Sequence, residues 1–246
     1  LDSQFDSQSS SIWPLAFPQT TIANSLRFNR GSSDYLSQTF GTPTSTKKGT
    51  HSVWFKLSKL QFQNLIGLQD GSTGMDIGID SSHRLNIFSS NTAASTVLSL
   101  DSTQLLRDSS AWYHVVVAID TTQATASNRV KVYLNGTQIT DFDTETYPSL
   151  NDEPVMCLGT DNASTFIGAS PYGGGANFLD GYIAEYIYVD GSQLDQTSFG
   201  AFNPVSNIWE PIAYAGTYGT NGFRLDYADS SALGNDVSGN DNDFTV

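Results

Sequence analysis

The sequence predicts an all-β sandwich of two antiparallel sheets. Short segments rich in Val, Ile, Tyr and Phe recur along the chain, each bounded by Gly, Asn, Asp or Ser. This pattern is typical of strands separated by turns. Segments with a helical period are almost absent, and Asn135-Gly136 is the strongest two-residue signal for a hairpin. With 246 residues, of which 38% are hydrophobic, the chain is long enough to bury the core of such a sandwich.

In chain order, the strand pattern occurs at residues 25–29, 51–57, 64–69, 75–80, 84–90, 113–120, 128–136, 164–170, 181–190 and 222–228. Residues 103–108 and 194–202 favour one or two helical turns each. Within 181–190, the even spacing of Tyr182, Tyr186 and Tyr188 predicts that they share one face of a regular strand. Many short strands with so little helix favour a sandwich over other all-β or mixed folds.

The hairpin prediction fixes a register. Both residues of Asn135-Gly136 tolerate the positive φ of a type I′ turn. With these two residues as the turn, Leu134 pairs with Thr137 and Val132 pairs with Ile139. Val132 and Ile139 then share the buried face of the sheet.

The same register bears on the segment TDFDTETY, residues 140–147, which carries Asp141, Asp143 and Glu145 at strand spacing. A regular strand beyond Ile139 would turn all three carboxylates inward, and burying unpaired carboxylates is too costly. We therefore expect the strand to bulge or stop near residue 141. The three carboxylates are then expected in a loop at the rim of the sandwich.

Charge and composition exclude some classes of function. The chain has 11 Lys and Arg against 25 Asp and Glu, a formal net charge of −14, whereas nucleic-acid binding needs a basic surface. No apolar run is long enough to span a membrane. The lone Cys157 has no internal disulfide partner and is expected to be a buried thiol. The chain begins at Leu1 without an initiator Met, so we expect a processed chain or a segment of a longer one.

Residues 111–139 resemble the signature of laminin-G-like domains in the concanavalin-A-like lectin/glucanase superfamily. The matching positions are Trp112, Tyr113, His114, Val115, Val130, Val132, Tyr133, Leu134, Asn135 and Gly136. Residues 178–195 resemble the closing strand of the same family, at Phe178, Gly181, Ile183, Glu185 and Tyr188. The resemblance implies a concanavalin-A-like jelly-roll sandwich. It leaves function open, because this fold hosts lectins, enzymes and spacers.

Residues 120–136, 180–202 and 218–245 are more particularly similar to laminin-G-like modules of bacteriophage virion proteins, including tail-fibre-like proteins. This resemblance implies a virion location, with a secreted or cell-surface protein as the alternative. We expect an N-terminal arm or linker at 1–21 and the jelly-roll domain at 22–203. Residues 204–246 are expected either to supply a final strand or to begin a second unit.

Two groups of residues are candidate sites. Asp141, Asp143, Glu145 and Tyr147, together with Tyr172 in the Gly-rich loop 170–181, are candidates for carbohydrate contact, since sugar rings stack on exposed aromatic faces. The carboxylates of this group could instead hold calcium or lie free in solvent. Asp236, Asn240, Asp241 and Asp243 in the tail are oxygen ligands of the kind calcium prefers, although ordinary Asx turns explain them as well.

Catalysis is not expected. Glucanases of this superfamily carry two Glu flanking an Asp on one inner strand, and retaining chemistry needs two carboxyls about 5 Å apart. Residues 141–145 begin with Asp and follow a hairpin. His114 and Glu185 are expected to be structural. We therefore expect a non-catalytic virion module that presents loops to host-surface glycans and requires no cofactor, with calcium as the one candidate ion. The alternative is an architectural module that contacts other virion proteins or copies of itself.

Overall fold

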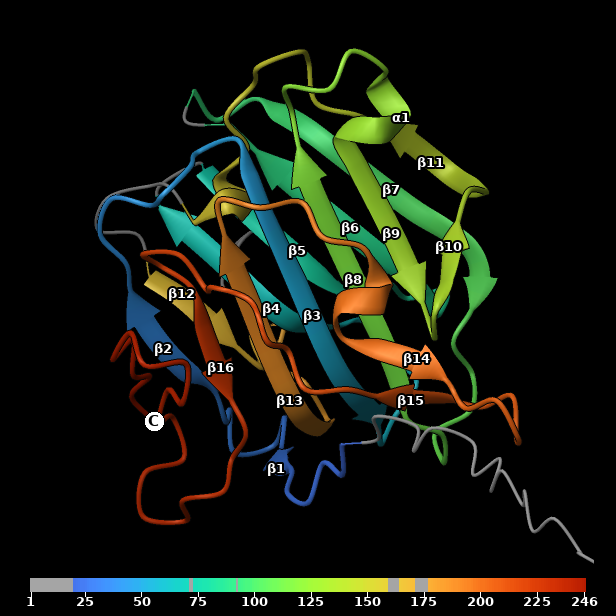
Figure 1. The fold of residues 1–246 in the computed structure, drawn as a ribbon, viewed down its shortest axis with the longest axis vertical. Helices are drawn as coiled ribbons and strands as arrows, with labels where there is room; N and C mark the ends of the chain where they lie inside the picture. Colours follow the sequence, from blue (N-terminus) through green and yellow to red (C-terminus); the bar gives the residue numbers. More distant parts are fainter. Residues whose placement is uncertain (1–19, 71–72, 92, 159–163, 171–176) are drawn as a thin grey trace, which may run out of the picture.

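The computed structural model describes residues 20–70, 73–91, 93–158, 164–170 and 177–246. They form two large antiparallel sheets packed face to face, sheet A in front and sheet B behind in Figure 1. The predicted all-β sandwich is confirmed. No helix in these ranges is both long and apolar enough to cross a membrane.

Sheet A runs in the order β1, β13, β3, β8, β9 and β10, and β16 also pairs with β13. Its strands are β1 (Leu26–Phe28), β3 (Lys48–Leu57), β8 (Tyr113–Asp120), β9 (Val130–Leu134), β10 (Thr137–Ile139), β13 (Gly181–Asp190) and β16 (Phe223–Leu225). Sheet B runs in the order β11, β7, β6, β5, β4, β12 and β2. Its strands are β2 (Leu36–Thr39), β4 (Gln63–Asp70), β5 (Thr73–Ile79), β6 (Arg84–Ser90), β7 (Thr96–Leu105), β11 (Phe142–Thr146) and β12 (Ser164–Ile167).

The remaining elements are short. They are the strand pair β14 (Gly200–Phe202) and β15 (Trp209–Pro211), the single helical turn α1 (Ala126–Arg129), and the 3₁₀ turns η1 (Val155–Cys157) and η3 (Gln196–Ser198). The prediction of helical turns at 103–108 was wrong, because residues 103–105 end β7 and extend its pairing in sheet B. At 194–202 only η3 is helical, and the last three residues form β14.

The hairpin register is confirmed. Asn135 and Gly136 both have positive φ, 48° and 79°, and the pairs Leu134–Thr137 and Val132–Ile139 form as predicted. The strand stops at Ile139, so Asp141 is not turned into the core, as expected from the cost of burying it.

The main core lies between the two sheets. Tyr113, Val115, Val117 and Ile119 of β8 line it in alternation, as strand periodicity requires. Cys157 lies in the same cluster as a buried free thiol.

The segment after residue 204 contributes to this core. β16 pairs with β13 through Phe223 and Leu225, whose side chains are buried. Phe244 packs on Phe223 and Phe40, and Thr245 bridges to Ser37 of β2. The tail therefore connects to both sheets.

A second layer covers the outer face of sheet A, where β14 and β15 lie across the front of β8 in Figure 1. Phe199 of this layer is 2% exposed and packs with Val116, Ile187 and Val189 on the outer side of the sheet. Sheet A is consequently buried on both faces over most of its length.

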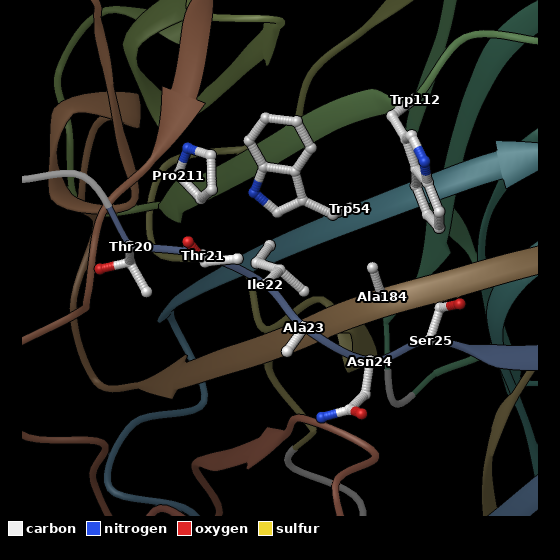
Figure 2. A pocket seen from close by; sticks show the side chains of 10 residues that line it. All are labelled: Thr20, Thr21, Ile22, Ala23, Asn24, Ser25, Trp54, Trp112, Ala184 and Pro211. Atoms are coloured by element: carbon white, nitrogen blue, oxygen red, sulfur yellow. The ribbon is translucent and has the colours of Figure 1, made fainter.

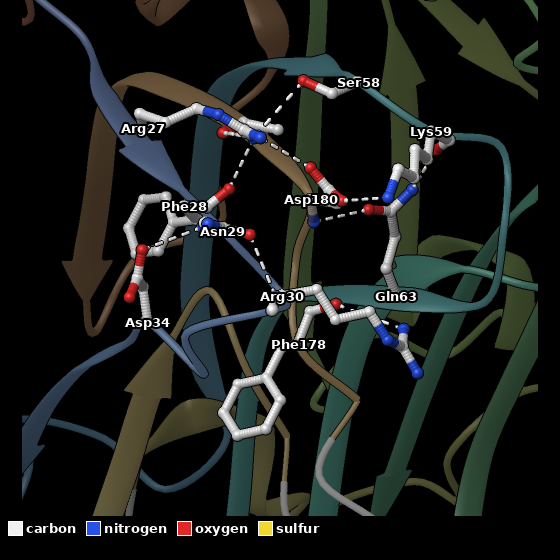
Figure 3. A network of polar contacts seen from close by, with 12 residues as sticks. Arg27, Phe28, Asn29, Arg30, Asp34, Ser58, Lys59, Gln63, Phe178 and Asp180 are labelled. Carbon is white, nitrogen blue, oxygen red and sulfur yellow. Dashed lines mark hydrogen bonds and ion pairs between the residues drawn. The ribbon is translucent and has the colours of Figure 1, made fainter.

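A polar network fixes β1 against the start of β13 (Figure 3). Arg27 and Lys59 both pair with Asp180, at 2.8 and 3.2 Å, and the side chain of Gln63 accepts a hydrogen bond from the Asp180 amide. Burial would raise the pKa of Asp180, but the hydrogen bonds from Arg27 and Lys59 outweigh it and lower that pKa. The carboxylate thus stays charged and holds β1, together with the segment that precedes it, in place.

Candidate functional site

Asp141 lies in the break after β10, as predicted, but Asp143 and Glu145 lie on a strand and not in a rim loop, so that part of the prediction was wrong. Asp143 and Glu145 belong to β11, the edge strand of sheet B, which pairs with β7. A register shift between Phe142 and Thr144 leaves Asp143 as the extra residue. Both acidic side chains are exposed, while Phe142 packs against the core. A charged, bulged edge strand of this kind discourages pairing with another chain.

The side chains of this group have local partners. Asp143 pairs with Arg84 of β6, and Asp141 accepts a hydrogen bond from Thr103 at 3.0 Å. The pKa of Tyr147 is raised to about 12, first by burial and then by its hydrogen bond to Glu145. Tyr172, the fifth predicted glycan contact, lies outside the described residues.

The four residues predicted for calcium form a hydrogen-bonded turn. Asp236 accepts hydrogen bonds from the amides of Arg224, Ser238 and Asn242, and Asp243 accepts one from the Asp236 amide.

The Asn240 amide donates to the carbonyls of Gly219 and Gly222, while Asp241 is exposed with a left-handed φ of 59°. In the part of the chain that the structure describes, no group of three or more His, Cys, Asp or Glu side chains is arranged to hold a metal.

A different site lies on the outer face of sheet A, beside β1. Residues 20–25, which we call the strap, run over β13 and β3 toward β1, and the Thr20 amide donates to the Pro211 carbonyl at 3.1 Å. Between the strap and the sheet is a cavity of about 400 Å³. Its lining consists of Thr20, Thr21, Ile22, Ala23, Asn24, Ser25, Trp54, Trp112, Ala184 and Pro211. We call this cavity the tryptophan pocket.

Two indoles dominate the tryptophan pocket (Figure 2). Trp54 projects from β3 and is 9% exposed, whereas Trp112 precedes β8 and is 40% exposed. The Trp54 Nε1–H is buried and has no hydrogen-bond partner among the described residues. The pocket therefore combines one solvent-facing aromatic surface with hydroxyl and amide groups of the strap.

A β-bulge in β13 gives the pocket its floor. Ile183 pairs with Phe55 and Glu185 pairs with Trp54, so Ala184 is an extra residue on β13. Its methyl group packs beside Trp54. Bulges of this kind re-aim side chains and are common next to functional sites.

The same bulge corrects the tyrosine prediction. Tyr186 and Tyr188 point into the core, but Tyr182 is on the opposite face, under the Arg27 guanidinium at 5.1 Å.

The pocket wall is held rigidly from behind. The ring of His114 stacks on Trp54 with centroids 4.6 Å apart, accepts a hydrogen bond from the Trp209 Nε1–H at 3.0 Å, and is 2.9 Å from the Ser52 hydroxyl. Burial lowers the pKa of His114 to about 3, so the ring is neutral. The expected structural role of His114 agrees with these contacts. Glu185 is likewise paired with Arg224 at 2.8 Å.

One further residue escaped the sequence analysis. Asp76 of β5 is 8% exposed and accepts a hydrogen bond from the Asn64 amide at 3.2 Å. Burial raises the pKa of Asp76 to about 7, although a hydrogen bond with Ser170 opposes the rise. Its signal in the sequence is an Asp inside the apolar strand pattern MDIGID, residues 75–80.

Two facing antiparallel sheets with a pocket beside one edge define a lectin-like β-sandwich. Residues 30–187 match the family model for the concanavalin A-like lectin/glucanases superfamily, and the chain belongs to that superfamily. The predicted jelly-roll fold is thereby confirmed. No curated protein matches the sequence.

Several solved structures are similar to this chain at low identity. A candidate carbohydrate binding protein from Bacteroides ovatus is 16% identical with a TM-score of 0.56, and the match covers 90% of this chain and 57% of that one. A SAP-like pentraxin from Limulus polyphemus is 16% identical with a TM-score of 0.49, covering 71% and 80%. The enzymatically active domain of tailspike protein 2 from bacteriophage CBA120 is 14% identical with a TM-score of 0.47, covering 72% and 26%.

Proposed function

We propose that this chain is a non-catalytic carbohydrate-binding module and that the tryptophan pocket is its site. The observation that carries the proposal is the pairing of the exposed Trp112 face with the buried Trp54 in one cavity of about 400 Å³. Ligand pockets of such size, mostly apolar with a few polar groups, are typical of small-molecule sites. The lectin-like superfamily and the Bacteroides ovatus neighbour support the same ligand class.

The chemistry of the lining fits a sugar ring. The C–H face of a pyranose stacks on an indole, and Trp112 offers such a face to solvent. The sugar hydroxyls would exchange hydrogen bonds with the side chains of Thr21 and Ser25, which are exposed on the strap. The unpartnered Trp54 Nε1–H is a further donor in the wall.

The absence of catalysis is part of the proposal. Glycoside hydrolysis needs two carboxyls facing the scissile bond, and the residues that line the tryptophan pocket carry none. Outside the pocket, the acids to test are the buried Asp76 and the exposed Glu145. If the protein hydrolysed a bound glycan and Asp76→Asn or Glu145→Gln abolished that hydrolysis, the proposed absence of catalysis would be refuted.

We place the module in a virion, on the similarity of residues 120–136 and 180–202 to bacteriophage virion modules. Host-surface glycans would be the ligands, and other virion proteins or copies of the chain the partners. A secreted or cell-surface protein is the alternative location. No cofactor is required in this proposal, because Asp236 in the calcium candidate already accepts hydrogen bonds from its own turn.

A purely architectural module is the second candidate, favoured by the β14–β15 hairpin. Phe202, Val205 and Ile208 on this hairpin are 44%, 91% and 59% exposed, more apolar surface than a solvated turn needs. Sedimentation of the wild type and of the Val205→Ser, Ile208→Ser double variant would test self-association. Dissociation of an oligomer by the double variant would favour this candidate.

The proposed function is tested by a glycan array, followed by calorimetry on the best ligand, each with calcium and with EDTA. Trp112→Ala should weaken binding by roughly five-fold or more, since the stacking of one nucleic-acid base on an aromatic side chain, the comparable interaction, is worth about 1–3 kcal/mol. Tyr35→Ala is the matched control, because Tyr35 is 39% exposed and does not line the pocket. Calcium and EDTA should give equal affinities. Equal loss in both variants, or binding to no glycan, would refute the proposal.

A further inference from the structure

The tryptophan pocket is built without ionisable side chains. Its lining offers two indoles, hydroxyl and amide groups, methyl groups and a proline ring. From this we infer that the site accepts uncharged sugar rings and discriminates against anionic ones such as uronic acids. The inference rests on the proposed function and specifies the ligand class of the same site.

The surroundings of the pocket are acidic. Glu185 follows the floor residue Ala184 and, with Asp226 and Arg224, lines a smaller cavity on which residues 20–24 of the strap also border. The charge of Arg224 is balanced by its ion pair with Glu185, so the remaining carboxylate, Asp226, gives this cavity a net negative charge. The chain as a whole carries a formal charge of −14. A carboxylate brought to the pocket therefore meets repulsion that a hydroxymethyl group does not.

Two cations lie on strands next to the pocket, and one of them is held by other partners. Lys56 lies two residues beyond Trp54 on β3 and interacts electrostatically with Asp108. Arg27 of β1 donates to Asp180 and to backbone carbonyls of Phe28 and Gly181. Neither side chain lines the pocket. A carboxylate in the pocket could pair with Arg27 only by drawing it out of these contacts.

The bulge at Ala184 also limits which groups of the pocket can recognise a sugar without using charge. Ala184 presents only a methyl group at the floor, and Trp54 presents a donor without acceptor capacity. Selection then depends on ring stacking and on hydrogen bonds to neutral groups, which change little with salt.

The test uses three sets of probes that differ only at carbon 6. These are methyl glucoside and methyl galactoside, their uronic acids, and their uronamides, each titrated calorimetrically into the full chain. The uronamide has the shape of the uronic acid without its charge. We expect the hexoside and uronamide of the preferred sugar to bind alike and its uronate to bind about ten-fold more weakly, with the difference shrinking at 1 M salt.

The outcomes separate the inference from the proposed function. A uronate that binds as tightly as its hexoside, or tighter, overturns the inference while carbohydrate binding stands. A uronamide as weak as the uronate also overturns it, because shape and not charge would then decide. If glycans bind but Trp112→Ala leaves their affinity unchanged, both the site and the inference fail. Lys56→Gln is the charge control and should leave all three affinities unchanged.

Discussion

At the scale of single residues, the buried ionisable groups set how stability depends on pH. His51 and His114 are 1% and 0% exposed, and burial lowers their pKa values to about 4 and about 3. Asp76 shows the opposite behaviour, since burial raises its pKa to about 7. All three groups are therefore held neutral in the folded chain near pH 6 and become charged on unfolding.

The two histidines should make the fold sensitive to acid. Their folded pKa values lie below the unfolded value of about 6.5, so their contribution to stability is complete above that pH and is lost as pH falls toward 4. Each adds a slope of roughly 1.4 kcal/mol per pH unit. Urea unfolding at pH 7, 6 and 5 would measure it. His114→Gln should lower stability at pH 7 yet reduce the slope; an unchanged slope would contradict the assignment.

Asp76 should make stability depend on pH in the opposite direction to the histidines. Its folded pKa is above the unfolded value of about 3.9, so its contribution is complete below pH 4 and is lost as pH rises through about 7. We expect Asp76→Asn to be more stable than the wild type at pH 8, by about 1 kcal/mol or more. The same variant should lose stability more steeply in acid, where the histidines then act unopposed. Lower stability of Asp76→Asn at pH 8 would argue against a costly buried carboxylate.

At the scale of elements, local signals were predictable and long-range ones were not. The β9–β10 hairpin followed from Asn135-Gly136 because turn chemistry acts between neighbours in sequence. The strand at 142–146 was missed because its partner β7 lies in the other sheet, about 40 residues upstream. The bulge at Ala184 could not be predicted from the sequence, since an alanine within a strand pattern does not indicate an extra residue. The tryptophan pocket was missed for that reason, although Trp112 stood inside the recognised motif.

The hairpin turn gives an element-scale prediction. Gly136 has a positive φ of 79°, and a Cβ there would run into the Trp209 ring. Gly136→Ala should therefore cost more than about 1 kcal/mol in the free energy of unfolding, from backbone strain and displacement of Trp209. Gly41→Ala is the matched control, because nothing lies within 4 Å of its Cβ position and its φ is ordinary. Equal effects of the two variants would show that the turn packing is unimportant.

At the scale of the whole molecule, the fold extends past the part that matches the family model, which ends at residue 187. Beyond it, β14 and β15 cover the outer face of sheet A, β16 joins that sheet, and Phe244 enters the core. The strand pattern predicted a sandwich and a strand at 222–228. It did not place the end of the tail, because that contact is between Ser37 and Thr245, which are 208 positions apart.

Phe244 tests how far the tail supports the sandwich. It is 5% exposed and packs against Phe40 and Phe223, so Phe244→Ala should lower the free energy of unfolding by about 3 kcal/mol or more. Val205→Ala should change it by less than about 0.5 kcal/mol, because Val205 is 91% exposed. The midpoints of denaturant unfolding of the two variants would measure this difference in stability. A small effect of Phe244→Ala would mean that the tail is only loosely attached.

The placement of the indoles also has a spectroscopic consequence. Of the four tryptophans in the chain, Trp54 and Trp112 face the same cavity, and Trp209 is linked to it through His114. A ligand seated on Trp112 would shield an indole that is now 40% exposed to water. Its emission would move to shorter wavelength, so the unlabelled protein carries an internal fluorophore that reports occupancy of its own pocket.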